Sequence, residues 1–99
     1  MARGDVYREP DGELLLLDIQ HGALDHLATR VVIPLMPSMG APPAIKRLYP
    51  IFEIEGRSYL MATPLMSAVA VSELRGPVAN VADHRDEITA AIDFLHQGF

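Results

Sequence analysis

The chain has 99 residues, the size of a single domain, and a formal net charge of −5 at pH 7. Hydrophobic residues make up 49 % of it, more than one small core needs, so we expect a second copy of the chain to cover part of the apolar surface. One lysine and seven arginines are spread from Arg3 to Arg85. This spread disfavours direct binding to nucleic acid, because no basic stripe can follow a phosphate backbone.

The composition also argues against several kinds of site and location. There is no cysteine, so neither a disulfide framework nor a zinc–thiolate site is possible. The first residues lack a signal-peptide pattern, and the longest apolar run, residues 14–17, is far too short to cross a bilayer. We therefore expect a cytoplasmic protein with no membrane contact and no cofactor.

The first two thirds of the chain predict short strands. Val6 and Tyr7 precede the turn signal Glu9-Pro10-Asp11-Gly12 and the leucine-rich residues 14–19, a pattern typical of a hairpin. Residues 30–35 are apolar and β-branched, which predicts a buried strand. We expect this strand to bend or end at Pro34, because proline cannot donate a ladder hydrogen bond.

The middle of the chain predicts a loop, a second hairpin and one further strand. Residues 37–43 are rich in proline and glycine, so we expect an exposed loop there. Residues 51–54 and 58–61 flank a short glycine-containing connection, as the strands of a hairpin do. After an interruption at Thr63-Pro64, residues 68–71 predict another strand. Strands followed by one helix predict an α+β domain with a mostly antiparallel, strongly bent sheet.

Residues 83–97 predict an amphipathic helix with one apolar stripe that we expect in the core. Asp83 is the candidate N-cap, and Gly98 can adopt the left-handed conformation of a C-cap. We expect the apolar side chain of Phe99 either to dock on the domain or to be presented to a partner. The stripe consists of Ile88, Ala91, Ile92 and Leu95.

The sequence contains no pattern that predicts catalysis or metal binding. The four histidines lack the i, i+4 spacing of a helical ligand pair, and nucleophile-elbow, P-loop and dinucleotide motifs are absent. Asp86 and Glu87 are adjacent and point apart on a helix, so their place in the first turn explains them. We therefore expect no catalytic residue and no metal site. A metal-free ribonuclease built from residues on several strands is an alternative that spacing alone leaves open.

Short motifs spread over nearly the whole chain match one family pattern in order and spacing. They are Leu17-Asp18-Ile19-Gln20, Thr29-Arg30, Val31-Val32-Ile33-Pro34-Leu35, Leu48-Tyr49-Pro50, Met61-Ala62-Thr63, Met66-Ser67-Ala68-Val69, Val78-Ala79, Ile88, Ala91-Ile92 and Gly98. With these motifs the chain resembles the CcdB family, the toxins of plasmid and chromosomal ccd toxin–antitoxin modules. The match needs one small deletion in the proline-rich loop and no gap from residue 48 to residue 99.

The resemblance implies a fold and a function. The fold is CcdB/MazF-like, an SH3-like barrel with a bent five-stranded antiparallel sheet, a small three-stranded sheet and a C-terminal α-helix, in a single toxin domain over residues 1–99. The implied function is that of a homodimeric toxin, not an enzyme. Such a toxin binds the A subunits of DNA gyrase, here called gyrase A, and traps the gyrase–DNA cleavage complex. The toxin is thus a topoisomerase poison, and it serves plasmid maintenance. A CcdA-like antitoxin neutralises it.

The resemblance also implies a gyrase-binding surface made of a short loop and the end of the helix. Gln97 and Phe99 take the first and last places of the family's terminal Trp-Gly-Ile, and Asp93 replaces an asparagine. These departures leave an alternative open, in which the chain keeps the fold and antitoxin binding but has lost or retargeted gyrase poisoning, as a decoy or anti-addiction module. The predicted gyrase-binding residues are Ala23, Leu24, Asp25, Asp93, Gln97, Gly98 and Phe99.

Overall fold

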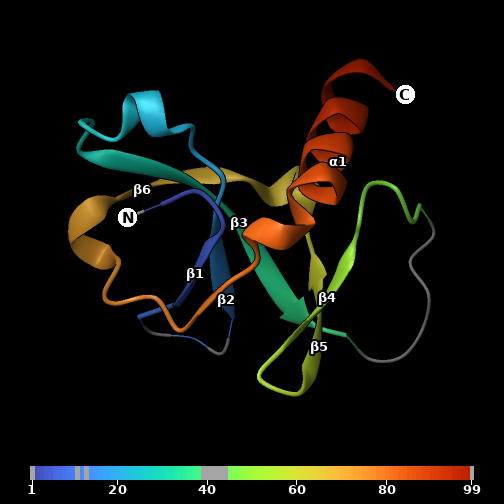
Figure 1. Cartoon of the computed structure of the whole chain (residues 1–99), viewed down its shortest axis with the longest axis horizontal. Coiled ribbons are helices and arrows are strands. Elements are labelled where there is room, and N and C mark those ends of the chain that lie inside the picture. The colour runs from blue at the N-terminus through green and yellow to red at the C-terminus, as the bar shows by residue number, and fades with distance from the viewer. Residues whose placement is uncertain (1, 11, 13, 39–44, 99) are drawn as a thin grey trace.

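A computed structural model describes residues 2–10, 12, 14–38 and 45–98. These residues form a strongly bent, nearly barrel-shaped antiparallel sheet with one C-terminal helix beside it (Figure 1). The predicted α+β class is confirmed. The strands are β1 (Asp5–Arg8), β2 (Leu15–Asp18), β3 (Thr29–Pro37), β4 (Ile51–Ile54), β5 (Arg57–Met61), β6 (Ser67–Ala70) and β7 (Ala79–Asn80). The 3₁₀ turns are η1 (Gly22–Leu24), η2 (Thr63–Leu65), η3 (Val71–Glu73) and η4 (Ala82–His84), and the helix is α1 (Arg85–Gln97).

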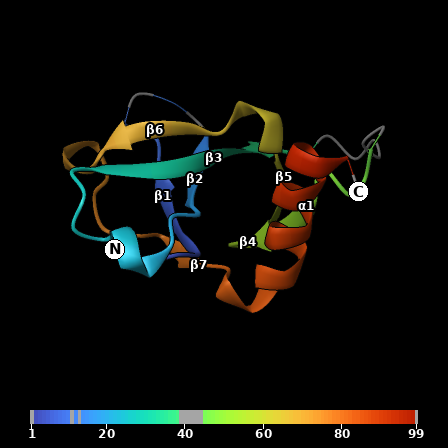
Figure 2. The ribbon, with the colours of Figure 1, turned by 90° about the horizontal axis from the view of Figure 1, so that it is seen from above.

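β3 is the strand at which two parts of the sheet meet. One part has the order β7-β1-β2-β3-β6 and the other β4-β5-β3, so the described strands give a five-stranded and a three-stranded part that share β3. β3 pairs with β6 through residues 29–32 and with β5 through residues 35–37. Figure 2 shows the long β3 with β6 beside one half of it. The five-plus-three arrangement that the resemblance implied is therefore present.

β3 continues through Pro34, so the strand does not end there. In an antiparallel strand the nitrogen and the carbonyl of one residue point to the same side, and the Pro34 carbonyl accepts from the Ala62 amide at 3.0 Å. Ala62 lies between β5 and η2, where the chain leaves β5 and has not yet entered β6. Pro34 falls between the residues of β3 that pair with β6 and those that pair with β5, so the donor that it lacks belongs to neither of these two pairings.

Both predicted hairpins are confirmed. β1 and β2 are antiparallel neighbours, and so are β4 and β5. The second hairpin is closed by Glu55 and Gly56, whose φ angles of 53° and 80° are those of a tight two-residue turn. The predicted strand near residue 70 is β6. Of the predicted loop at residues 37–43, Pro37 is the last residue of β3 and residues 39–43 lie outside the described residues, as does Asp11 of the first turn.

The main core lies between the sheet and α1. Leu17, Ile33 and Phe52 belong to one buried hydrophobic cluster that also contains Ile88 of the helix. The predicted stripe residues at positions 91 and 92 also belong to this cluster or pack against it. Leu95 is 37 % exposed, so its assignment to the core is wrong. The last turn of α1 extends beyond the sheet, which leaves no core for Leu95 to enter (Figure 1).

The ends of α1 agree with the prediction at one end only. Asp83 is not the N-cap, because the chain first makes the 3₁₀ turn η4 and His84 then takes the N-cap position without a side-chain cap. His84 Nδ1 lies 3.0 Å from Glu87 Oε1 in the first turn of the helix. Gly98 has a φ of 80°, and its amide donates to the Phe94 carbonyl at 2.8 Å. The predicted left-handed C-cap is therefore confirmed.

Candidate functional site

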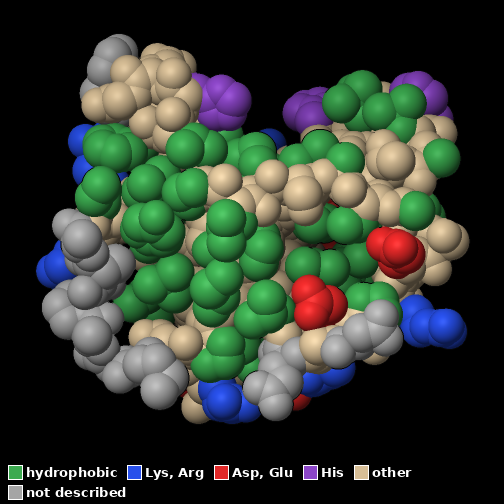
Figure 3. Space-filling view, turned by 180° about the vertical axis from the view of Figure 1, so that it is seen from behind, with side chains coloured by type: hydrophobic (Ala, Val, Ile, Leu, Met, Phe, Trp, Pro, Cys, Tyr) green, Lys and Arg blue, Asp and Glu red, His purple; other side chains and the backbone are tan. Residues whose placement is uncertain are grey.

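The two segments predicted to bind a partner rise from the same side of the molecule. One is the loop of residues 21–28, which contains η1, and the other is the last turn of α1 (Figure 1). In the space-filling view they form two prominences with a notch between them, and histidine side chains lie on both (Figure 3). We call them the loop prominence and the helix prominence. A partner that spans the notch can contact both at once.

The loop prominence presents apolar side chains to solvent. Leu24 is 45 % exposed, and its predicted neighbours in the site, Ala23 and Asp25, are exposed as well. Leu27 in the same loop is 41 % exposed. Two exposed leucines on one short loop make an apolar patch of the kind that a protein partner covers.

A buried ion pair ties the loop prominence to the sheet. Asp18 at the end of β2 is 0 % exposed and Arg30 in β3 is 1 % exposed. Arg30 Nε donates to Asp18 Oδ2 at 2.8 Å, and Nη2 donates to Asp18 Oδ1 at 2.9 Å. The third guanidinium nitrogen, Nη1, donates to Asp25 Oδ1 at 2.6 Å. One planar guanidinium therefore connects the interior of the sheet to the exposed loop.

Two other side chains fix the backbone of this loop. Gln20 is 4 % exposed, accepts from the Val31 amide at 3.0 Å and donates to the Leu24 carbonyl at 2.8 Å. His21 Nδ1 accepts from the Ala23 amide at 3.0 Å and so caps η1. The conformation in which Ala23 and Leu24 are exposed is thus held by side-chain hydrogen bonds on both sides.

Burial and hydrogen bonding shift the pKa values in this network in different directions. The hydrogen bond from Arg30 holds the pKa of Asp25 below its ordinary value. Burial raises the pKa of Asp18, while hydrogen bonds from Gln20 and Arg30 oppose that change. Burial lowers the pKa of Arg30, but its hydrogen bonds to Asp25 and Asp18 raise it more, and the net shift is upward. The exposed Asp25 therefore stays ionised to lower pH than an isolated aspartate.

The helix prominence combines polar and apolar groups. Leu95 adds an exposed apolar side chain near the end of α1. Phe94 is half-buried, and the Arg47 guanidinium lies 5.2 Å from the centroid of its ring, a cation–π contact that joins the segment before β4 to the helix. Phe99 lies outside the described residues. The predicted residues Asp93, Gln97 and Gly98 are exposed.

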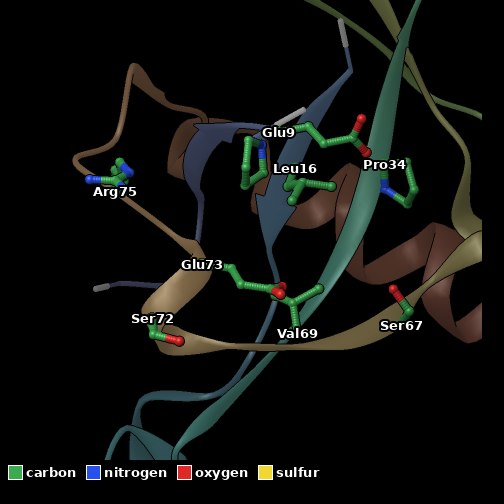
Figure 4. Close-up of a pocket in the computed structure, with 9 residues that line it drawn as sticks. Glu9, Leu16, Pro34, Ser67, Val69, Ser72, Glu73 and Arg75 are labelled. Atoms are coloured by element: carbon green, nitrogen blue, oxygen red, sulfur yellow. The ribbon is translucent and has the colours of Figure 1, made fainter. Parts of the chain in front are cut away.

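A separate groove of about 540 Å³ lies over β2, β3 and β6 (Figure 4). Leu16, Pro34 and Val69 give it apolar walls, and the carboxylates of Glu9 and Glu73 point toward its interior. Among the described residues, no group of three or more histidine, aspartate or glutamate side chains is placed to hold a metal ion.

A family model described as CcdB protein matches residues 3–98. The chain belongs to the CcdB family. This membership supports a role as the toxin of a toxin–antitoxin pair, and the match includes both prominences up to Gly98. No helix in the part of this CcdB-family chain that the structure describes is long and apolar enough to cross a membrane.

Asp18 and Arg30, which hold the loop prominence of this CcdB-family chain, were not among the predicted site residues, whereas their partner Asp25 was. The signal in the sequence is Asp18, a single carboxylate at the end of a leucine run, and Arg30, directly before an apolar β-branched run. A charge inside a buried strand needs a partner of opposite sign. This reasoning could have paired the two residues, but not shown that Arg30 also reaches Asp25.

Proposed function

We propose that this CcdB-family chain is a gyrase poison, which binds gyrase A through the loop and helix prominences and traps the gyrase–DNA cleavage complex. It needs no catalysis of its own. A CcdA-like antitoxin neutralises it, and it acts as one domain in the cytoplasm. The observation that carries the proposal is the family match over residues 3–98, together with the exposure, on one side of the molecule, of those implied contact residues that the structure describes.

The physical properties of the surface favour a protein partner. The net charge of −5 opposes close approach to a phosphate backbone. Leu24 and Leu95 offer apolar area, and exposed apolar side chains beside polar ones are typical of protein interfaces. A loop that is already held by hydrogen bonds loses little conformational entropy when it binds. These features suit a contact in which the toxin inserts the loop prominence and the helix prominence into its target.

We also propose that the active form is a homodimer. Figure 3 shows hydrophobic side chains gathered on the face that carries β6. On this stretch of chain Leu65 is 54 % exposed, and Ala68 and Ala70 are exposed too. Among the described strands β6 pairs with β3 alone, so its other edge has no strand partner. A second copy of the chain could cover this face, as the high hydrophobic content led us to expect.

Expression in bacteria that lack an antitoxin tests the proposed poisoning. We expect growth to stop and DNA breaks to appear that carry covalently attached gyrase. A strain whose gyrase A resists this family of poisons is the control and should keep growing. Normal growth of the sensitive strain, with soluble and folded toxin in the cells, would contradict the proposal.

Gln97 favours a second candidate function, that of an antitoxin-binding decoy. The family's tryptophan at this place is a large aromatic group of the kind that dominates binding energy, and Gln97 is an exposed polar side chain instead. A pull-down with separate gyrase A and antitoxin baits distinguishes the two functions. A decoy binds the antitoxin alone, and Gln97→Trp should then restore gyrase binding if the helix prominence is the contact.

A further inference from the structure

The hydrogen bonds of Asp25 indicate a role other than direct contact with a partner. Its Oδ1 is engaged by Arg30 Nη1 at 2.6 Å, and Arg30 is itself held by both carboxylate oxygens of Asp18. We propose that Asp25 and Arg30 are positioning residues, which hold Leu24 in the orientation that the partner binds. This inference rests on the proposed function, because it concerns how the same surface is kept in shape.

Arg30 is suited to this role because its own position is fixed. The side chain is 1 % exposed, and two of its nitrogens face Asp18, which is completely buried. Asp25 therefore binds a donor that cannot move without breaking the bidentate pair below it. A lysine has one charged nitrogen on a flexible stem and could not face both carboxylates with this planar geometry.

The loop needs such a restraint because packing does not supply one. Residues 21–28 are all exposed, so the loop has no buried side chain of its own. The hydrogen bonds of Gln20 fix the loop from the sheet side, and the cap by His21 fixes its first turn. Asp25 closes the other end of η1 through Arg30. Without the Asp25–Arg30 hydrogen bond, Leu24 would sample several orientations, and selecting one of them on binding would cost conformational entropy.

Asp25→Asn in the full chain tests the inference, because it changes one exposed group and leaves the Asp18–Arg30 pair in place. The matched control is Glu53→Gln, which also removes one exposed carboxylate but lies on β4. The first readout is hydrogen exchange at the amides of Leu24 and Asp25, which bond to backbone carbonyls within the loop. We expect exchange to become about fivefold faster in Asp25→Asn and to stay unchanged in the control.

The second readout is affinity for purified gyrase A. We expect Asp25→Asn to bind about tenfold more weakly than the parent chain. A double-mutant cycle with Leu24→Ala then separates positioning from contact. If Asp25 acts by holding Leu24, the leucine substitution weakens binding less in the Asp25→Asn background, whereas two independent contacts give additive losses.

The exchange and affinity results together decide whether Asp25 positions Leu24. Unchanged exchange with lost affinity and additive losses would overturn the inference, since Asp25 would then be a direct contact. Faster exchange with unchanged affinity would also overturn it, because the orientation of Leu24 would not matter to the partner. If the parent chain itself does not bind gyrase A, the proposed function fails. The exchange experiment alone would then show whether Asp25 holds the loop.

Discussion

Replacing Arg30 by methionine removes the guanidinium that neutralises a completely buried carboxylate. In the variant, Asp18 keeps the hydrogen bond from the Gln20 amide at 3.0 Å but loses both bonds from Arg30. The contact with Asp25 is lost too, but that side chain is 50 % exposed, so solvent replaces most of what it loses. The penalty therefore comes mainly from the buried, uncompensated charge on Asp18.

The expected loss of unfolding free energy is about 3–5 kcal/mol, the usual cost of removing one partner of a buried ion pair. This is a large part of the roughly 5–15 kcal/mol that stabilises a domain. Urea unfolding followed by circular dichroism, with parent and variant at one protein concentration, measures the difference. Asp18→Leu combined with Arg30→Met is the control. It should recover most of the loss, because it removes the stranded charge as well.

The loss should also depend on pH. Burial already raises the pKa of Asp18, and without Arg30 less opposes that shift, so the pKa rises further. A carboxyl whose folded pKa lies above its unfolded value of about 3.9 destabilises the fold as the pH rises through the folded value. Arg30→Met should therefore lose more stability at about pH 7 than at about pH 5. A loss under about 1 kcal/mol, or an equal loss at both pH values, would refute the reasoning.

Three further substitutions test other parts of the account. Gly98→Ala should lower stability by about 1 kcal/mol in thermal unfolding, because alanine is strained at a φ of 80°; no change would contradict the C-cap assignment. Asp25→Asn should lower stability at about pH 6 but not at about pH 2, since a carboxyl with a lowered folded pKa stabilises the fold only while ionised; an equal effect at both pH values would argue against the Arg30 contact. Ala68→Glu places a charge on the exposed apolar face and should halve the mass measured by light scattering; a variant that stays dimeric would place the interface elsewhere.

The elements that the sequence predicts well are those with local signals. The hairpin at Glu55 and Gly56 follows from a short glycine-containing connection between two apolar runs, and the C-cap follows from Gly98 just after the last helical residue. Each signal lies within a few residues of the structure that it predicts. Turn and cap chemistry depends on the backbone of those residues alone, so neighbouring residues are enough to identify it.

The errors concern features that depend on tertiary structure. The strand does not end at Pro34, which lies between the part of β3 that pairs with β6 and the part that pairs with β5, and only the sheet order reveals that position. Leu95 has the spacing of a core residue, but it lies in the last turn of α1, which extends beyond the sheet. Arg30 bonds to Asp18 across two neighbouring strands and to Asp25 in the loop between them. No periodicity in the sequence indicates how far a helix overhangs or which charges meet inside a sheet.

The most direct test of the proposed function is a calorimetric titration of purified gyrase A with the parent chain, Leu24→Glu and Glu53→Gln. Leu24→Glu puts a charge at the centre of the loop prominence and replaces a side chain that has no role in the network, in which Leu24 takes part through its backbone alone. Glu53→Gln changes an exposed position on β4. We predict that the parent and Glu53→Gln bind with equal affinity and that Leu24→Glu binds at least about 100-fold more weakly. Absence of binding by the parent, or equal binding by Leu24→Glu, would contradict the claim that this CcdB-family chain binds gyrase A through its loop prominence.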